Sequence, residues 1–171
     1  MERTFIPINI ALLTVSDTRT LDNDTSGKVL REGILSAGHQ LAAQQIVPDD
    51  MYQIRSIISQ WIAASDVDAV ITTGGTGLTG RDGTPEALKV LLDKEIEGFG
   101  ELFRQISYQN IKTSTIQSRA LGGVANGTFV FCLPGSSGAC KTGWNDILKE
   151  QFDARHRPCN FIDLIPRLLE R

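Results

Sequence analysis

Cysteine is scarce in this chain, and its cysteines are not arranged in pairs. The 171 residues include three cysteines, Cys132, Cys140 and Cys159, and no two of them have CxxC spacing. An odd number of cysteines without such spacing predicts neither a disulfide framework nor a zinc knuckle. Reduced thiols are typical of cytosolic proteins, so we expect a cytoplasmic location.

Long hydrophobic runs are also absent. The apolar stretch 6–15 is interrupted by Pro7 and Asn9, and no other stretch approaches the roughly 18 apolar residues of a membrane-spanning helix. We therefore expect neither a membrane segment nor a targeting segment. The formal net charge of -3 offers no overall attraction to nucleic acid or to an anionic membrane surface. We expect no nucleic-acid partner and no membrane partner.

Several common site motifs are missing or incomplete. The two histidines, His39 and His156, lack metal-ligand spacing, and a lone histidine is usually structural. No GxGxxG follows a predicted strand, which leaves a dinucleotide site unsupported. Residues 135–142 (GSSGACKT) resemble a Walker A phosphate loop, but Cys140 stands where glycine normally precedes the lysine. We expect Lys141 to lie in the first turns of a helix, and Cys132 to be a small core residue.

What the chain does contain is an alternation of apolar runs and amphipathic stretches. Apolar runs typical of buried strands occupy residues 9–15, 69–73 and 128–133, and residues 40–47 show a weaker strand pattern. Helical patterns mark residues 26–37, 54–62, a segment that opens at Thr84, 95–108 and 139–152. Strands that alternate with helices build a parallel sheet covered on both faces. We predict an α/β fold, a three-layer doubly wound mostly parallel sheet, in a single domain spanning residues 1–171.

Three polar loops should lie together at one edge of this sheet. Residues 16–24, 74–83 and 134–138 each follow a predicted strand and are rich in Gly, Ser, Thr or Asp. Ligands of such sheets bind beyond the carboxyl ends of the strands. The sequence therefore predicts an anion-friendly pocket that binds a phosphorylated small molecule at the loop from Thr73 to Thr84.

Residues 74–77 (GGTG) are the best candidates for phosphate contacts in that loop. Glycine permits backbone conformations in which successive N–H groups point into one concavity, and the Thr76 hydroxyl adds a donor. Thr84 is predicted to cap the next helix, with Pro85 at its first position, and a helix N-terminus also favours anions. The alternative is a simple tight connection, because glycine runs are common in turns.

A carboxylate beside phosphates requires a cation between them, and Asp82 lies within the same loop. Mg2+ is typically held by one or two carboxylates together with substrate phosphates. Alternatively, Asp82 is a turn residue bonded to its own backbone. Asp49 and Asp50 precede the clearest helix, and their position favours a capping role for either one.

Residues 72–87 (TTGGTGLTGRDGTPEA) strongly resemble the MoaB/MogA family of molybdenum cofactor biosynthesis proteins. The resemblance continues in order through nearly the whole chain, at residues 14–17 (TVSD), 24–27 (DTSG), 97–101 (EGFGE), 103–107 (FRQIS), 117–119 (QSR) and 133–136 (LPGS). The tail at residues 152–161 (FDARHRPCNF) looks more like the MoaB branch than the MogA branch.

The resemblance implies a compact α/β molybdopterin-binding domain that assembles as a homo-oligomer, a trimer or a hexamer of two trimers. Active members are nucleotidyltransferases that move AMP from Mg-ATP to the terminal phosphate of molybdopterin. The family's two functionally important aspartates correspond to Asp49 and Asp82, which become the expected catalytic residues and Mg2+ ligands. This replaces the structural interpretation of Asp49. The expected contacts to pterin or phosphate are Ser16, Asp17, Gly74, Gly75, Thr76, Gly77, Ser107, Ser118, Arg119, Pro134, Gly135 and Ser136.

Other interpretations stay open at this point. One alternative is a non-catalytic protein of the MoaB branch that stores or delivers molybdopterin. Some members of that branch are changed around the two aspartates, whereas this chain keeps both. A purely structural oligomer partner with an unoccupied crevice is a further alternative. The family resemblance also implies other molybdenum cofactor biosynthesis proteins as partners. Arg119 could equally form a surface ion pair.

Overall fold

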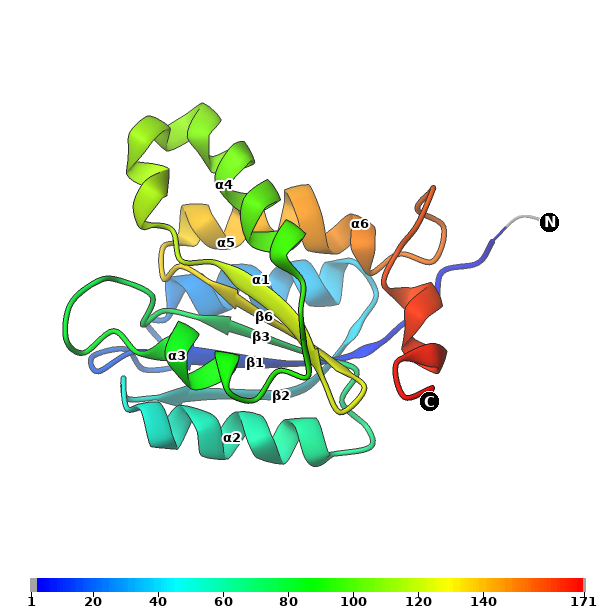
Figure 1. The fold of residues 1–171 in the computed structure, drawn as a ribbon, viewed down its shortest axis with the longest axis horizontal. Coiled ribbons are helices and arrows are strands. Elements are labelled where there is room, and N and C mark those ends of the chain that lie inside the picture. The colour runs from blue at the N-terminus through cyan, green and yellow to red at the C-terminus, as the bar shows by residue number, and fades with distance from the viewer. Residues whose placement is uncertain (1–2, 171) are drawn as a thin grey trace.

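The computed structural model describes residues 3–170, and its centre is a six-stranded sheet (Figure 1). In chain order the strands are β1 (Asn9–Val15), β2 (Gln40–Val47), β3 (Ala69–Thr73), β4 (Lys94–Glu95), β5 (Leu121–Ala125) and β6 (Thr128–Leu133). Their order across the sheet is β2-β1-β3-β6-β5-β4. The four strands predicted from the sequence are confirmed, with the predicted limits.

Those four strands pair in parallel, and an antiparallel edge extends them. β1 pairs with β2 and β3, and β3 pairs with β6, all in parallel. β5 runs antiparallel to β6, and β4 runs antiparallel to β5. Neither antiparallel strand is predicted from the sequence, because β4 has two residues and β5 (LGGVA) contains two glycines, which weaken strand propensity. The predicted α/β class with a mostly parallel sheet is confirmed.

Helices cover both faces of the sheet and give three layers. One face carries α1 (Thr25–Ser36), α4 (Glu97–Ile111) and α5 (Ser137–Gly143), and the other carries α2 (Met51–Ala63) and α3 (Thr84–Lys89) (Figure 1). Alternate residues of β1 serve the two cores, since Ile10 and Leu12 pack with the α1 side and Ala11 and Leu13 with the α2 side. A strand buried on both faces is apolar throughout, which makes it visible in the sequence.

Side-chain caps set where two of these helices start. Asp24 caps α1 by accepting a hydrogen bond from one first-turn amide, and Asp50 caps α2 by accepting from two. The predicted capping role of Thr84 is wrong, because the N-cap of α3 is Gly83 and Thr84 is already helical. The Thr84 hydroxyl is therefore not bonded to the first turn of that helix.

Two predicted helices have different limits in the structure. α4 starts at Glu97 because Glu95 belongs to β4, and the 3-10 turn η1 (Lys112–Gln117) follows it. The predicted helix 139–152 consists of α5, the π-helical turn η2 (Trp144–Leu148) and α6 (Lys149–Gln151). The 3-10 turn η3 (Ile162–Arg167) lies near the end of the chain. No helix within residues 3–170 has both the length and the apolar character needed to cross a bilayer.

Candidate functional site

The loops that follow β1, β3 and β6 meet at the carboxyl edge of the sheet, on the left of Figure 1. The amide of Gly74 donates to the carbonyl of Leu133 at 3.2 Å. Arg81 reaches from the glycine-rich loop to Asp17 and donates two hydrogen bonds, of 2.7 and 3.2 Å. Three loops that are far apart in the sequence therefore form one polar surface.

The start of the glycine-rich loop needs glycine for two reasons. Gly74 and Gly75 have φ angles of +96° and +63°, which residues with side chains rarely adopt. In addition, a Cβ at position 74 would clash with the Val15 carbonyl, and one at position 75 would clash with the Thr84 hydroxyl. Within residues 3–170, the amides of Gly75 and Thr76 donate no hydrogen bond. These two amides are donors that the loop can offer to a ligand.

Asp49 lies between β2 and α2 but leaves the capping of α2 to Asp50. Its Oδ1 accepts a 3.3 Å hydrogen bond from the amide of Gly83, so its side chain faces the glycine-rich loop. Burial raises the pKa of Asp49, and repulsion from the carboxylates of Asp82 and Asp17 raises it further, despite the bond from Gly83. A carboxyl group placed among other carboxylates is one that a bound cation would stabilise.

Asp82 is held by its own loop. Its Oδ2 accepts hydrogen bonds from the amide of Thr79 at 3.0 Å and from the hydroxyl of Thr79 at 2.5 Å. The bond from that hydroxyl is the main cause of the lowered pKa of Asp82. The contacts of Oδ2 are therefore those of a residue that stabilises its own turn, as the alternative interpretation of Asp82 predicts. Oδ1 takes part in neither of these two hydrogen bonds.

Ser16 and Asp17, at the end of β1, are tied to neighbouring segments. The hydrogen bond from Arg81 is the main cause of the lowered pKa of Asp17. The hydroxyl oxygen of Ser16 accepts from the amides of Thr18 and Arg19, at 3.2 and 3.1 Å, and so forms a local turn. Both residues order the surface around the loop through contacts within the chain.

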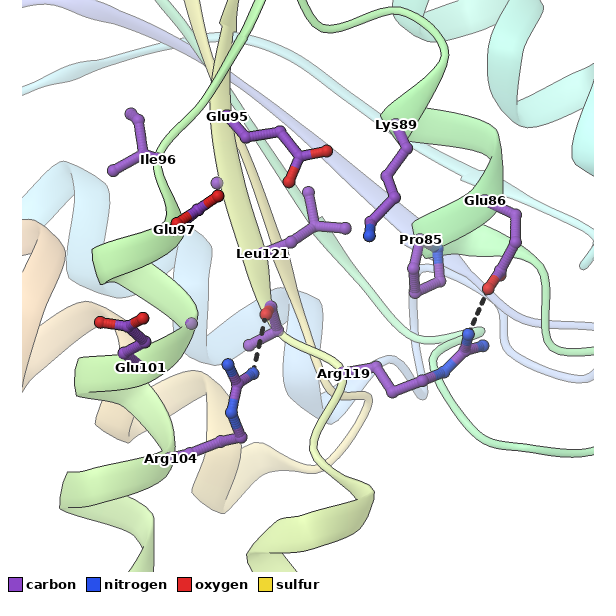
Figure 2. Close-up of a pocket in the computed structure, with 13 residues that line it drawn as sticks. Pro85, Glu86, Lys89, Glu95, Ile96, Glu97, Glu101, Arg104, Arg119 and Leu121 are labelled. Atoms are coloured by element: carbon purple, nitrogen blue, oxygen red, sulfur yellow. Dashed lines mark hydrogen bonds and ion pairs between the residues drawn. The ribbon is translucent and has the colours of Figure 1, made fainter.

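Arg119 clamps the glycine-rich loop from the segment that precedes β5. Its Nε donates to the carbonyl of Thr76 at 2.9 Å and its Nη2 to that of Gly77 at 2.6 Å. Its Nη1 pairs with Glu86 (Figure 2). Burial raises the pKa of Glu86, but the hydrogen bond from Arg119 helps to make the net shift downward. Most N–H groups of the Arg119 guanidinium donate to other residues of the chain. Arg119 therefore positions the loop.

The loop after β6 is fixed through its carbonyl groups. The carbonyl of Pro134 accepts from the hydroxyl of Thr73 at 3.0 Å, and that of Gly135 accepts from the hydroxyl of Ser26 at 2.7 Å. Ser136 caps α5. These three predicted contact residues thus lie at the same edge of the sheet as the glycine-rich loop.

The two predicted serines near α4 differ in their placement. Ser118 directly precedes the clamping Arg119, and its carbonyl accepts from Arg104 at 3.3 Å. Ser107 is buried on α4, and no hydrogen bond within residues 3–170 joins it to the glycine-rich loop. Contacts of either serine with a ligand stay a prediction.

The two aspartates could contribute to a Mg2+ site without completing one. Within the described part of the chain, no group of three or more His, Cys, Asp or Glu side chains is arranged to hold a metal ion. Mg2+ commonly takes one or two carboxylates and fills its remaining positions with water and substrate phosphates. Asp49 and Asp82, which interact electrostatically across the loop, fit a cation that arrives with a phosphate ligand.

Two hollows flank this surface. One, of about 420 Å³, lies between α3, α4 and β5 and is lined by Glu86 and Arg119, among others (Figure 2). Arg119 also holds the glycine-rich loop, so the hollow and the loop adjoin at this residue. The second hollow, of about 430 Å³, is lined by Ser16, Asp17 and the end of β2.

Three residues that order the site are not predicted from the sequence. Thr79 holds Asp82, Arg81 holds Asp17, and Glu86 holds Arg119. Glu86 is 33 positions from its partner and Arg81 is 64, so no spacing rule links them. The one local signal is that Thr79 lies three residues before Asp82, a separation common in turns.

Comparison with known proteins shows the family of the chain. Residues 11–154 match a family described as "Probable molybdopterin binding domain". Molybdenum cofactor biosynthesis protein B of Escherichia coli (strain K12) is 54% identical over 157 residues, which cover 92% of each chain. The chain belongs to the MoaB/MogA family. The family resemblance noted at residues 72–87 is thereby confirmed.

Solved MoaB structures share the fold. A crystal structure of a molybdenum cofactor biosynthesis protein B has a TM-score of 0.84 at 44% identity and covers 87% of this chain and 93% of that one. The tungsten cofactor synthesizing protein MoaB from Pyrococcus furiosus has a TM-score of 0.76 at 39% identity, with coverage of 85% and 93%. The mixed sheet with helices on both faces is thus the fold of MoaB proteins.

Proposed function

We propose that this MoaB/MogA protein is a molybdopterin adenylyltransferase, which moves AMP from Mg-ATP to the terminal phosphate of molybdopterin. The observation that carries the proposal is the placement of Asp49, freed from capping, against Asp82 and the glycine-rich loop. Amide donors and carboxylates on one surface suit a ligand that brings both phosphate and Mg2+.

The proposed reaction joins two phosphates. An oxygen of the molybdopterin phosphate attacks the α-phosphorus of ATP, the bond from that phosphorus to the oxygen bridging to the β-phosphate breaks, and pyrophosphate leaves. The attacking phosphate is already ionised, so the chain needs little base catalysis and depends on positioning and charge neutralisation. Mg2+ would neutralise phosphate charge when bound.

Residues of the chain have distinct parts in this proposal. The free amides of Gly75 and Thr76 donate to phosphate oxygens, and Asp49 and Asp82 hold the cation. Arg119 keeps the loop in place through its two bonds to loop carbonyls. The hollows on either side offer room for the ring systems of two substrates.

One observation favours the non-catalytic alternative, a protein that stores or delivers molybdopterin. The Oδ2 of Asp82 is already bonded to Thr79, as expected of a residue that only braces a turn. This alternative predicts an affinity for molybdopterin that is indifferent to ATP and Mg2+.

Pyrophosphate release separates the two functions. The purified protein incubated with molybdopterin and Mg-ATP should release pyrophosphate, and Asp82→Ala should abolish the release while the fold is kept. Asp146→Asn, which removes an exposed carboxylate on η2, is the control and should retain full activity. If the unaltered protein binds molybdopterin but never turns over ATP, the proposed function is wrong.

A further inference from the structure

Thr84 has a buried hydroxyl that forms no hydrogen bond in the described part of the chain. The residue is 0% exposed, and its Oγ1 is bonded to nothing within residues 3–170. An unpaired buried hydroxyl lowers stability, so its presence needs a reason. Helix capping is not that reason, because the N-cap of α3 is Gly83.

The hydroxyl faces the space above Gly75. A Cβ at position 75 would clash with Thr84 Oγ1 and would lie 2.8 Å from Oδ2 of Asp49. The two oxygens therefore border the same small space, which glycine leaves open. The amide of Thr84 donates to the carbonyl of Gly75 at 2.9 Å and keeps these residues side by side.

The Asp49 carboxylate accepts few hydrogen bonds on the side that faces this space. Its Oδ1 accepts one long hydrogen bond, of 3.3 Å, from Gly83, and its Oδ2 accepts none within residues 3–170. Carboxylates that bind cations are usually oriented by a hydrogen bond from a neighbouring group. The unpaired donor of Thr84 and the unpaired acceptor of Asp49 thus lie beside each other.

We propose that Thr84 is a positioning residue, whose hydroxyl donates to the Asp49 carboxylate when a Mg2+-phosphate ligand is bound. In this structure no hydrogen bond joins the two oxygens, although both lie within 2.8 Å of the point where a Cβ at position 75 would stand. The proposed bond therefore requires the Asp49 carboxyl group to rotate when the ligand binds. The inference rests on the proposed function, because it assigns Asp49 to the cation that accompanies the nucleotide. It adds a residue that touches neither the cation nor the substrate.

Thr84→Val tests this role, because valine keeps the shape of threonine and removes the hydroxyl. Without ligand, the midpoint of thermal unfolding should stay the same or rise, since an unpaired group is replaced by an apolar one. The affinity for α,β-methylene-ATP with Mg2+, measured by calorimetry, should fall by about tenfold. Thr84→Ser keeps the hydroxyl and should bind within about twofold of the unaltered protein.

Thr72→Val is the matched control. Thr72, on β3, is also 0% exposed, and its hydroxyl also lacks a hydrogen-bond partner within residues 3–170. It lies beside the Cys132 thiol and precedes the loop. The same substitution there should leave the nucleotide affinity unchanged. Adding Thr84→Val to Asp49→Asn should cost no further affinity, because the hydroxyl is proposed to act through Asp49.

Unchanged nucleotide affinity in Thr84→Val would overturn the inference. So would a ligand-free unfolding midpoint of Thr84→Val well below that of Thr72→Val, because the hydroxyl would then be a structural donor. AMP transfer plays no part in this measurement. A protein that binds the Mg2+-nucleotide in a Thr84-dependent way but releases no pyrophosphate contradicts the proposed function alone, and one that binds no Mg2+-nucleotide contradicts both.

Discussion

Asp49 and Asp50 are adjacent carboxylates with different contacts. Asp50 accepts hydrogen bonds from the first turn of α2, whereas Asp49 turns toward Gly83 and the glycine-rich loop. Burial and the nearby charges of Asp82 and Asp17 raise the pKa of Asp49, so its ionised form is held at a cost in folding free energy. Such a cost is common where a charge serves a ligand.

Asp49→Asn should separate stability from activity. The asparagine carbonyl can keep the hydrogen bond from Gly83, and losing a repelled, partly buried charge should leave the free energy of unfolding unchanged or higher. Pyrophosphate release should fall by about 100-fold or more, as when other electrostatic contacts to reacting groups are removed. Denaturation and turnover assays measure the two quantities, and normal turnover would refute the role of Asp49.

The three thiols should differ in reactivity. Burial raises the pKa of Cys132 to about 12 and that of Cys140 to about 11, so neither forms the reactive thiolate at neutral pH. Cys159 is exposed. An aromatic disulfide reagent should modify one thiol quickly in the folded protein and all three after denaturation. Rapid modification of a second thiol in the folded protein would be inconsistent with the buried positions.

The contacts of several single residues in the site could not be predicted from the sequence. Spacing assigns Asp49 and Asp50 the same capping potential, and only the family resemblance pointed to Asp49 as functional. Arg119 is 43 positions from Thr76 and 42 from Gly77, so its clamp on the loop has no local pattern. The sequence predicted Thr84 as the N-cap of α3, but the N-cap is Gly83, one residue earlier. For that reason the sequence does not indicate that the Thr84 hydroxyl is buried without a partner within residues 3–170.

Among the elements, α2 depends on its cap at the edge of the site. Asp50→Ala removes the acceptor for two first-turn amides and should lower the free energy of unfolding by about 1 kcal/mol. Asp146→Ala, at an exposed position, should change it by less than about 0.5 kcal/mol. Urea denaturation measures both variants. Equal effects of the two substitutions would show that Asp50 does not stabilise α2 by capping.

Strands that are buried along their whole length could be predicted from the sequence, and short or glycine-containing strands could not. β1, β3 and β6 are buried along their length and therefore read as continuous apolar runs. β4 and β5 lack such runs, and the hollow between α3, α4 and β5 was missed with them. A wall of a cavity cannot be predicted when the strand that forms it is not.

In the molecule as a whole, alternating strands and helices were enough to predict the three layers. The two apolar cores on opposite faces of the sheet follow from that alternation. The trimer or hexamer implied by the family resemblance stays a prediction, because contacts between subunits leave no periodic pattern in one sequence. Cytoplasmic location and partner proteins likewise stay predictions.

Stability of the whole molecule should fall in mild acid because of His39. This side chain is buried against the rings of Phe5, Trp144 and Phe152. Burial lowers its pKa, although the charge of Asp153 opposes the shift. The unfolded chain therefore binds a proton more readily than the folded one. Stability from this residue should be fully present above about pH 7 and should decline as the pH falls through about 6.5, the unfolded value.

Thermal unfolding at about pH 7.5 and about pH 5.5 measures this decline. His39→Gln should reduce the difference between the two midpoints, whatever its effect on the midpoints themselves. His156→Gln, which removes the other histidine, is the control and should keep the difference. An unchanged difference in His39→Gln would assign the acid sensitivity to other groups.

Labelled phosphate shows whether the chain moves AMP onto molybdopterin. With ATP labelled at the α-phosphate, the label should appear in the pterin product, whereas label at the γ-phosphate should leave with pyrophosphate. Label that never reaches the pterin, or that reaches it from the γ-position, would show that the chain does not transfer AMP to molybdopterin.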